Sequence, residues 1–308
     1  MAYLLAFDSG NLTESDAGIF DNRSHLCQAS KLENLMASEL PFLSRARMWD
    51  SFYGEPRVAE FRRRVYLEAF GSEYSIDEAS DGYITRTELR QMADALCVGG
   101  GQTFADLGCG RGAPGQWLAR TLGADLVGID ISEIALEQAR ARARQLGLAE
   151  RVFYRGARYD ATGLDVASMD GAVSVDVIWA IPDKLAGFSE TARILRPGAR
   201  FVFVDWERDL SPPGYPAPVN DHRPLLDAAG FEIELRQLHP EADAMRRAFY
   251  EKMLEYQADL FGLVDEKTAE STLREAKAWM GLLDGVDYMK HSRRVFIAAR
   301  KAAGQIGS

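Results

Sequence analysis

Hydrophobic and polar positions alternate along the middle of the chain in a rhythm that predicts an α/β fold. From about residue 84, short apolar or β-branched runs are separated by segments whose apolar residues recur at helical spacing. This alternation is typical of βαβ units and a mostly parallel sheet. The predicted strands are residues 103–107, 125–129, 152–156, 171–175 and 201–205, then a sixth after Gly230 and a seventh at 294–298.

Two regions outside this rhythm are predicted to be helical. Residues 1–83 form a polar arm, with a helix after Ser30, and an amphipathic cap in which aromatic and charged residues interleave. Residues 238–292 carry two apolar stripes, Met245 to Leu260 and Ala269 to Leu283, that predict a helical hairpin. Plain packing explains such stripes, but this hairpin could also cover the open end of the sheet. The predicted organisation is therefore a cap at 1–83, a core at 84–237, a lid insertion at 238–292, and a last strand with the tail at 293–308.

Charge and composition narrow the classes of partner. The chain has 36 Lys and Arg residues against 46 Asp and Glu, a formal net charge of −10, which repels nucleic acid. No stretch is long and apolar enough to span a membrane, and the first residues do not form a signal peptide. Three cysteines without C-x-x-C spacing favour a reducing cytoplasm, and the four histidines lack zinc-site spacing, so no metal is expected.

The strongest chemical motif is a glycine-rich turn directly after the first predicted strand. Residues 106–112 read DLGCGRG, in which glycines alternate and let the backbone approach a bound ligand. Such a turn alone is a weak indication, but Asp130 ends the second strand about twenty residues later. An acid there can accept both ribose hydroxyls, which favours a nucleoside ligand with a free 2′-hydroxyl. The alternative role of Asp130, a helix N-cap, is already filled by Ser132.

Three segments together resemble class I S-adenosylmethionine-dependent methyltransferases. They are DLGCGRG at 106–112, VGIDIS at 127–132 and ILRPGARF at 194–201, in which Ala199 stands where a second glycine is common. The resemblance implies a Rossmann-like, doubly wound sheet of seven strands, mostly parallel with an antiparallel last strand. It also implies S-adenosyl-L-methionine as cofactor. The core is most similar to methyltransferases of quinone and specialised-metabolite biosynthesis.

The resemblance assigns cofactor contacts to matching positions. In the family the glycine loop lies under the methionine moiety, the acid after strand two binds the ribose, and the next residue covers one adenine face. Ala157 departs from the Gly-Asp pair that usually follows strand three, and Asp160 supplies an acid for the adenine slightly later. The predicted cofactor-binding residues are Asp106, Gly108, Cys109, Gly110, Asp130, Ile131, Asp160, Ala161 and Val175.

The acceptor is expected at the carboxyl ends of strands four and five, where α/β sheets bind ligands. Trp179 and Trp206 lie just past those strands and could form a wall or stabilise a sulfonium, and Tyr53 would close the site. Hinge packing explains the tryptophans equally well. A hydroxyl acceptor would need a base, for which position suggests Asp176, Glu207 and His222. Asp176 could instead cap a helix or hold the cofactor's ammonium group.

The sequence therefore predicts methyl transfer to oxygen, nitrogen or carbon of a small molecule. The segment after strand four lacks the Asn/Asp-Pro-Pro-aromatic tetrad that related enzymes use for planar nitrogens, which again disfavours nucleic acid. Two alternatives remain open: a nicotinamide-dependent oxidoreductase, although Tyr-x-x-x-Lys is absent after strand four, and a non-catalytic S-adenosylmethionine-binding protein. The arm before Pro41 would suit exchange between subunits of a homo-oligomer.

Overall fold

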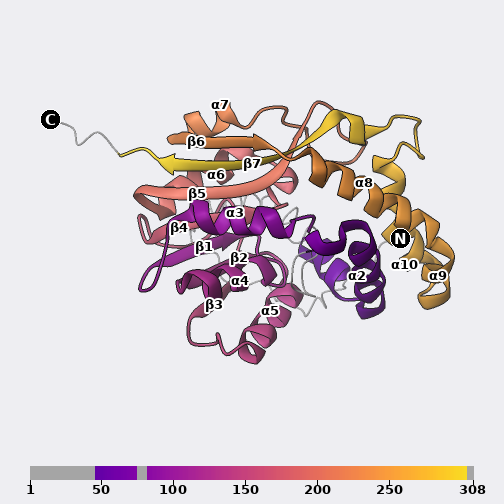
Figure 1. Cartoon of the computed structure of the whole chain (residues 1–308), viewed down its shortest axis with the longest axis horizontal. Helices are drawn as coiled ribbons and strands as arrows, with labels where there is room; N and C mark the ends of the chain where they lie inside the picture. Colours follow the sequence, from indigo (N-terminus) through magenta and orange to yellow (C-terminus); the bar gives the residue numbers. More distant parts are fainter. Residues whose placement is uncertain (1–45, 75–81, 304–308) are drawn as a thin grey trace, which may run out of the picture. The chain divides into compact units, whose positions relative to one another are not determined.

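One seven-stranded sheet runs through the computed structural model, which describes residues 46–74 and 82–303 (Figure 1). The strand order is β3-β2-β1-β4-β5-β7-β6. The strands are β1 (Thr103–Leu107), β2 (Asp125–Asp130), β3 (Val152–Gly156), β4 (Met169–Val175), β5 (Leu195–Arg208), β6 (Phe231–Leu238) and β7 (Ser292–Lys301).

The topology confirms the predicted sheet. Strands β1 to β5 pair in parallel, whereas β7 is antiparallel to both β5 and β6. The chain leaves β1 toward β2 on one side and later returns to β4 on the other. Ligands of open α/β sheets bind outside the carboxyl ends of the strands at such a reversal of strand order. A ligand-binding site is therefore expected at the carboxyl ends of β1, β2 and β4.

Helices cover both faces of the sheet because successive strand residues point to opposite sides. On one face, α3 (Arg86–Leu96), α4 (Ala113–Leu122) and α5 (Glu133–Gln145) pack in a core that includes Phe104. On the other, α6 (Lys184–Ile194) and α7 (Arg223–Ala228) pack in a core that includes Ala105. The Ser132 hydroxyl accepts the Ala135 N–H at 3.2 Å, so it caps α5 as predicted.

A third apolar core joins the amino-terminal helices to the insertion between β6 and β7. It contains residues of α2 (Pro56–Phe70), α8 (Pro240–Glu255), α9 (Gln257–Leu263) and α10 (Glu266–Trp279). Residues 46–53 are also helical, and Pro56 begins α2 as a separate helix. A proline favours extended backbone in the residue before it, so the predicted amphipathic cap is divided into two helices at Glu55. The first stripe of the insertion is likewise divided, at Tyr256.

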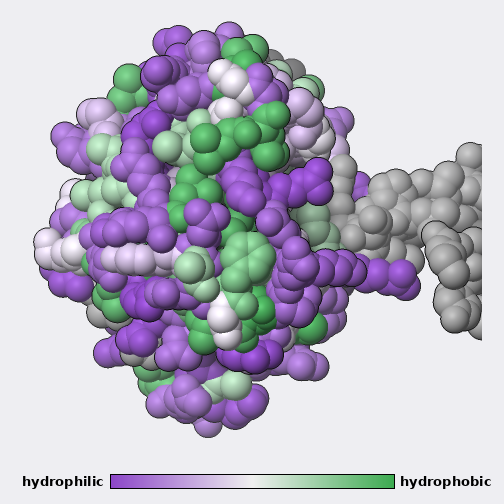
Figure 2. Space-filling view, turned by 90° about the vertical axis from the view of Figure 1, so that its right-hand side faces the viewer, coloured by the Kyte–Doolittle hydropathy of each residue, from purple (hydrophilic) through white to green (hydrophobic). Residues whose placement is uncertain are grey.

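Apolar side chains are scattered over the outer surface of the insertion. Figure 2 shows a broken hydrophobic band among hydrophilic residues on the face at the right of Figure 1. Exposed apolar residues of the insertion include Phe261 and Leu263 of α9 and Leu282 and Leu283 after α10. None of the described helices combines the length and apolar character needed to cross a membrane. The helix expected after Ser30 and the proposed exchange arm lie outside the described residues.

Candidate active site

The glycine turn between β1 and α4 is fastened to the end of β2. Gly108 and Gly110 have φ angles of +77° and +51°, a region in which a side chain is strained. The N–H groups of Gly108 and Cys109 both donate to the Ile129 carbonyl, at 2.8 and 3.0 Å. The Cys109 carbonyl accepts the Gly112 N–H at 2.8 Å. The loop is thus held rigidly beside the carboxyl end of the neighbouring strand.

Asp130 connects this loop to the start of α5. Its Oδ2 accepts the Gly110 N–H at 2.8 Å, and its Oδ1 accepts the Ser132 N–H at 2.9 Å. Burial raises the pKa of Asp130, and these backbone hydrogen bonds oppose that rise. A carboxylate oxygen has two lone pairs, so each oxygen retains capacity for a further donor. Asp130 can therefore accept a pair of hydroxyls without releasing the loop.

Asp106 lies beneath the same loop at the end of β1. It is only 2% exposed, and its Oδ2 has no hydrogen-bond partner among the described residues. A Cβ added to Gly115 would collide with that carboxylate, so Asp106 faces the first turn of α4. Burial, followed by the charge of Asp130, raises the pKa of Asp106 to about 7. The two acids therefore share a poorly solvated region at the turn.

Replacing Asp106 by Asn should make stability less sensitive to pH. Because its pKa is raised, the folded protein binds this proton more tightly than the unfolded chain does. The stability that this contributes is complete below about pH 4, and is lost as the pH rises to about 7. The melting temperature of Asp106→Asn relative to the parent should thus increase from about pH 5 to about pH 8. The exposed Asp94→Asn is the control, and parallel curves for all three proteins would contradict the assignment.

The remaining predicted cofactor residues surround the same edge with different roles. The Cys109 thiol is buried against Gly128, and both of its backbone groups are already hydrogen-bonded, so it shapes the loop. Ile131 and Val175 are half-buried. Asp160 lies in the turn after β3, where it accepts from the Arg158 guanidinium at 2.6 and 2.7 Å, and Ala161 is exposed beside it.

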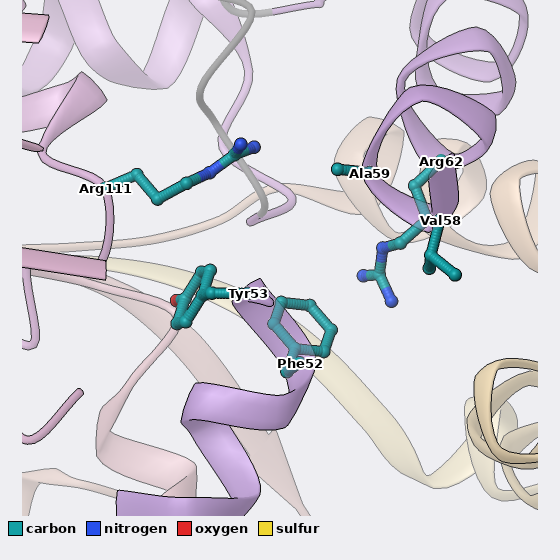
Figure 3. Close-up of a pocket in the computed structure, with 6 residues that line it drawn as sticks. All are labelled: Phe52, Tyr53, Val58, Ala59, Arg62 and Arg111. Carbon is teal, nitrogen blue, oxygen red and sulfur yellow. The ribbon is translucent and has the colours of Figure 1, made fainter. Parts of the chain in front are cut away.

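The helix at residues 46–53 covers the glycine loop. The Tyr53 hydroxyl would lie 2.8 Å from a Cβ placed on Gly110. Asp50 Oδ1 accepts the Ser132 hydroxyl at 2.6 Å, which fixes the helix against the start of α5. A small cavity lies beside this helix, where Figure 3 shows the Arg111 side chain extending from the loop and Tyr53 below it. The lining residues are Phe52, Tyr53, Val58, Ala59, Arg62 and Arg111.

The segment after β4 contacts both the loop and a second cavity. The Val177 side chain rests against Gly108, where a Cβ would have no room. Two residues later, Trp179 lines the second cavity and donates its indole N–H to the Asp176 carbonyl at 2.8 Å. Trp49 of the covering helix lies 6.4 Å from the Trp179 ring and 6.3 Å from the Tyr53 ring, centre to centre. The two regions are therefore neighbours joined by aromatic side chains.

The second cavity, also small, lies where the insertion meets the ends of β4 and β5. It includes both predicted tryptophans, Trp179 and Trp206. Sequence reasoning missed its other lining residues, although a charged residue inside the apolar stripe of α8 was a usable indication. Those residues are Tyr83, Arg208, Arg246, Tyr250, Glu275 and Trp279.

Asp176 is the one predicted base close to these cavities, and it is already engaged. It has a φ of +58°, pairs with the Arg294 guanidinium, and accepts the Tyr83 N–H at 2.6 Å. Burial raises its pKa, and the charge of Arg294 opposes that rise. These contacts suit a residue that anchors the segment after β4.

Glu207 and His222 lie together on the opposite side of β5 from Trp206. Burial acts to raise the pKa of Glu207, but hydrogen bonds from His222 and Arg236 hold it at about 2. The His222 ring is buried, with ring centres 6.2 and 5.5 Å from Phe188 and Phe203. Neither Glu207 nor His222 lines either cavity. Within 46–74 and 82–303, no group of three His, Cys, Asp or Glu residues could hold a metal ion.

Comparison with known sequences identifies the region that contains the glycine loop. A family model described as a methyltransferase domain matches residues 105–203. The chain is also 38% identical over 181 residues to the methyltransferase GfsG from Streptomyces halstedii. That alignment covers 54% of this chain and 62% of the relative. The chain thus spans less than two thirds of that relative's length.

Solved structures share the fold at low sequence identity. The cyclase SpnF aligns with a TM-score of 0.61 and 21% identity, over 70% of this chain and 81% of its own. A phosphoethanolamine N-methyltransferase 2 from Haemonchus contortus, solved with S-adenosyl-L-methionine, aligns with a TM-score of 0.59 and 19% identity. That alignment covers 78% of this chain and 56% of the other. Residues 105–203 therefore resemble a methyltransferase domain in sequence, and the chain shares its Rossmann-like fold with these solved structures.

Proposed function

We propose that this protein transfers a methyl group from S-adenosyl-L-methionine to a small molecule bound beneath α8 and α10. One observation carries the proposal. The segment after β4 has Val177 against the glycine loop and Trp179 in a separate aromatic cavity, so two ligands would meet across it. The methyltransferase relative and the match over residues 105–203 support the same reaction.

The residues of the loop fit the proposed cofactor. Gly108 and Gly110 have positive φ angles, and neither position has room for a Cβ in its present surroundings. Asp130 has lone pairs left for the two ribose hydroxyls, Ile131 would cover an adenine face, and Asp160 would accept from the adenine amino group. When bound, S-adenosylmethionine would supply a methyl group that is activated by its positively charged sulfur.

The chain itself would position the acceptor and exclude water. Alignment of two reactants is worth several kcal/mol of barrier, and the leaving group needs no further activation. Among the charged residues that line the second cavity, Glu275 is the one carboxylate. It accepts the Tyr250 hydroxyl at 2.8 Å and the Tyr83 hydroxyl at 3.2 Å. For a hydroxyl acceptor, Glu275 is therefore better placed than Asp176, Glu207 or His222 to take the proton.

Cofactor binding would require the 46–53 helix to move. The cavity beside the loop is closed in by its lining residues and has no room for a ligand of the cofactor's size. Tyr53 lies over Gly110 and would have to shift as the ligand enters. The helix would then close again over the bound cofactor and keep water from the reacting atoms.

Cys97 and Cys109 are unpaired thiols, which suits the cytoplasmic location that we propose.

Calorimetry followed by a turnover assay tests this function. Purified protein should bind S-adenosylmethionine and its demethylated product, and it should not bind NAD. With a metabolite mixture, mass spectrometry should then detect an acceptor that has gained one methyl group, together with the demethylated product. Uptake of NAD without S-adenosylmethionine would favour the oxidoreductase. Cofactor binding with a rearranged but unmethylated product would favour a non-methylating role, since a cyclase shares the fold.

A further inference from the structure

Two buried arginines line the second cavity, close enough for their positive charges to repel each other. Arg208, the last residue of β5, is 6% exposed, and Arg246 of α8 is 1% exposed. Both line the cavity and both lie against tryptophan rings. The Arg246 Cζ is 3.9 Å from the ring centre of Trp206, and the Arg208 Cζ is 4.5 Å from that of Trp279. Guanidinium groups stack on such rings, but stacking leaves their in-plane N–H donors free for other partners.

The described residues offer these two guanidinium groups few hydrogen-bond acceptors. Among the described residues, Arg208 Nε has no hydrogen-bond partner. The hydrogen bonds of Arg246 go to the Met289 thioether, at 2.8 and 3.3 Å, which is a weak acceptor. A buried charge is costly unless it is paired, and neighbouring Arg294 meets that need with Glu88 and Asp176. Within residues 46–74 and 82–303, neither Arg208 nor Arg246 forms such a pair with a carboxylate.

Three carboxylates lie near these arginines, and each is occupied elsewhere. Glu275 accepts both tyrosine hydroxyls, Asp205 accepts the backbone N–H groups of Trp179 and Trp206, and Asp243 accepts the backbone N–H of Arg294. Burial, followed by the charge of Arg246, lowers the pKa of Arg208 to about 10. Two arginines and one carboxylate, Glu275, line the cavity, so its lining carries one more positive than negative charge and has guanidinium donors available for a ligand.

We propose that Arg208 and Arg246 bind an anionic oxygen group, a carboxylate or a phosphate, on the methyl acceptor. Arginine donates parallel N–H groups that match both anions, and two arginines can bind opposite sides of one group. The rest of the acceptor would lie along the rings of Trp179, Trp206 and Trp279, which favours a planar, apolar body. This inference rests on the proposed function, because it assigns the second cavity to the acceptor.

Matched probes that differ in charge test the inference. Benzoate, phenyl phosphate and neutral benzamide are titrated into full-length protein saturated with the demethylated cofactor. Three of the five tryptophans line the cavity, so tryptophan fluorescence reports binding. We expect benzoate or phenyl phosphate to bind at least ~10-fold more tightly than benzamide, which corresponds to one added charge-assisted hydrogen bond. The tighter of the two anions identifies the group.

Substitutions then locate the preference. Arg246→Met and Arg208→Met should each weaken binding of the preferred anion at least ~10-fold and leave the affinity for benzamide unchanged. Arg247→Met is the matched control, because Arg247 is the next residue on α8 and pairs with Asp287 instead of lining the cavity. Arg247→Met should change the affinity for neither the anion nor benzamide. Melting temperatures and binding of the demethylated cofactor establish that each variant is folded.

The results separate this inference from the proposed function. Equal binding of anion and amide by the parent protein, with the cofactor product still bound, would overturn the anionic acceptor alone. A preference for the anion that persists in both arginine variants would also overturn it. The same holds if Arg247→Met abolishes the preference as well. If the parent protein fails to bind S-adenosylmethionine and its product, the methyltransferase function itself falls, whatever the probes do.

Discussion

Asp130→Asn should weaken binding of S-adenosylmethionine and of its demethylated product by between about 30-fold and about 1,000-fold. The substitution keeps the shape of the side chain but removes the charge that would hold the ribose hydroxyls. Loss of one or two charge-assisted hydrogen bonds costs about 2 to 4 kcal/mol of binding free energy. Calorimetry measures both affinities directly. The fold should survive, because the Asn oxygen can still accept from Gly110 or Ser132.

Asp125→Asn is the matched control for this experiment. Asp125 begins the same strand, but its carboxylate pairs at the surface with Arg151, at 3.1 Å. Surface pairs of this kind contribute about 0 to 1 kcal/mol, so cofactor affinity should not change. If Asp130→Asn remains folded by thermal melting and binds the cofactor as the parent does, then Asp130 does not bind the ribose. The nucleoside assignment would then lose its principal residue.

Most of the sheet could be predicted because its determinants are local. The first strand is an apolar run bounded by glycine turns, and its predicted residues match β1 in the structure. The fifth strand was predicted too short. β5 extends to Arg208, since β7 pairs with it continuously from Arg200 to Arg208. That antiparallel pairing joins segments about ninety residues apart, and no local pattern reveals where it ends.

The cofactor-binding part of the site could also be predicted, because its residues are close together in the sequence. The glycine loop and Asp130 are consecutive features of one βαβ unit, and their spacing alone places them together. The acceptor side is assembled from distant segments. Arg208, Arg246 and Glu275 meet only when the insertion packs on the ends of the strands. Arg246 lies within an apolar stripe that packing alone explains, so the local pattern does not single out its charge.

Strand geometry alone separates two of the predicted site residues. Trp206 and Glu207 were both assigned to the site, although neighbouring residues of a strand point to opposite faces. In the structure Trp206 and Arg208 line the cavity, whereas Glu207 lies with His222 on the other side. Trp206 was therefore compatible with Arg208 and incompatible with Glu207. Alternation along β5 therefore pairs Trp206 with Arg208 on the face that lines the cavity.

Arg294→Met should reduce the free energy of unfolding by about 3 to 5 kcal/mol at neutral pH. The Arg294 guanidinium is fully buried, donates to Glu88 at 2.9 and 3.2 Å, and also pairs with Asp176. Removing it leaves two buried carboxylates without their cation, which costs far more than the pair contributes. Urea unfolding followed by circular dichroism measures the change. The segment after β4 should also loosen, since Asp176 anchors it.

The pH dependence of this loss identifies its cause. Burial alone would raise the pKa of Glu88, but Arg294 and the hydrogen bond from His239 hold it at about 2, below its ordinary value of 4.5. The stabilisation is therefore present above about pH 4.5 and is lost as the pH falls toward 2. The difference between parent and Arg294→Met should therefore shrink as the pH falls from about 4.5 toward 2. The adjacent Arg293→Met, which removes an exposed pair with Asp209, should cost at most about 1 kcal/mol. Equal losses for the two variants, or a loss independent of pH, would show that Arg294 acts through packing and not through charge.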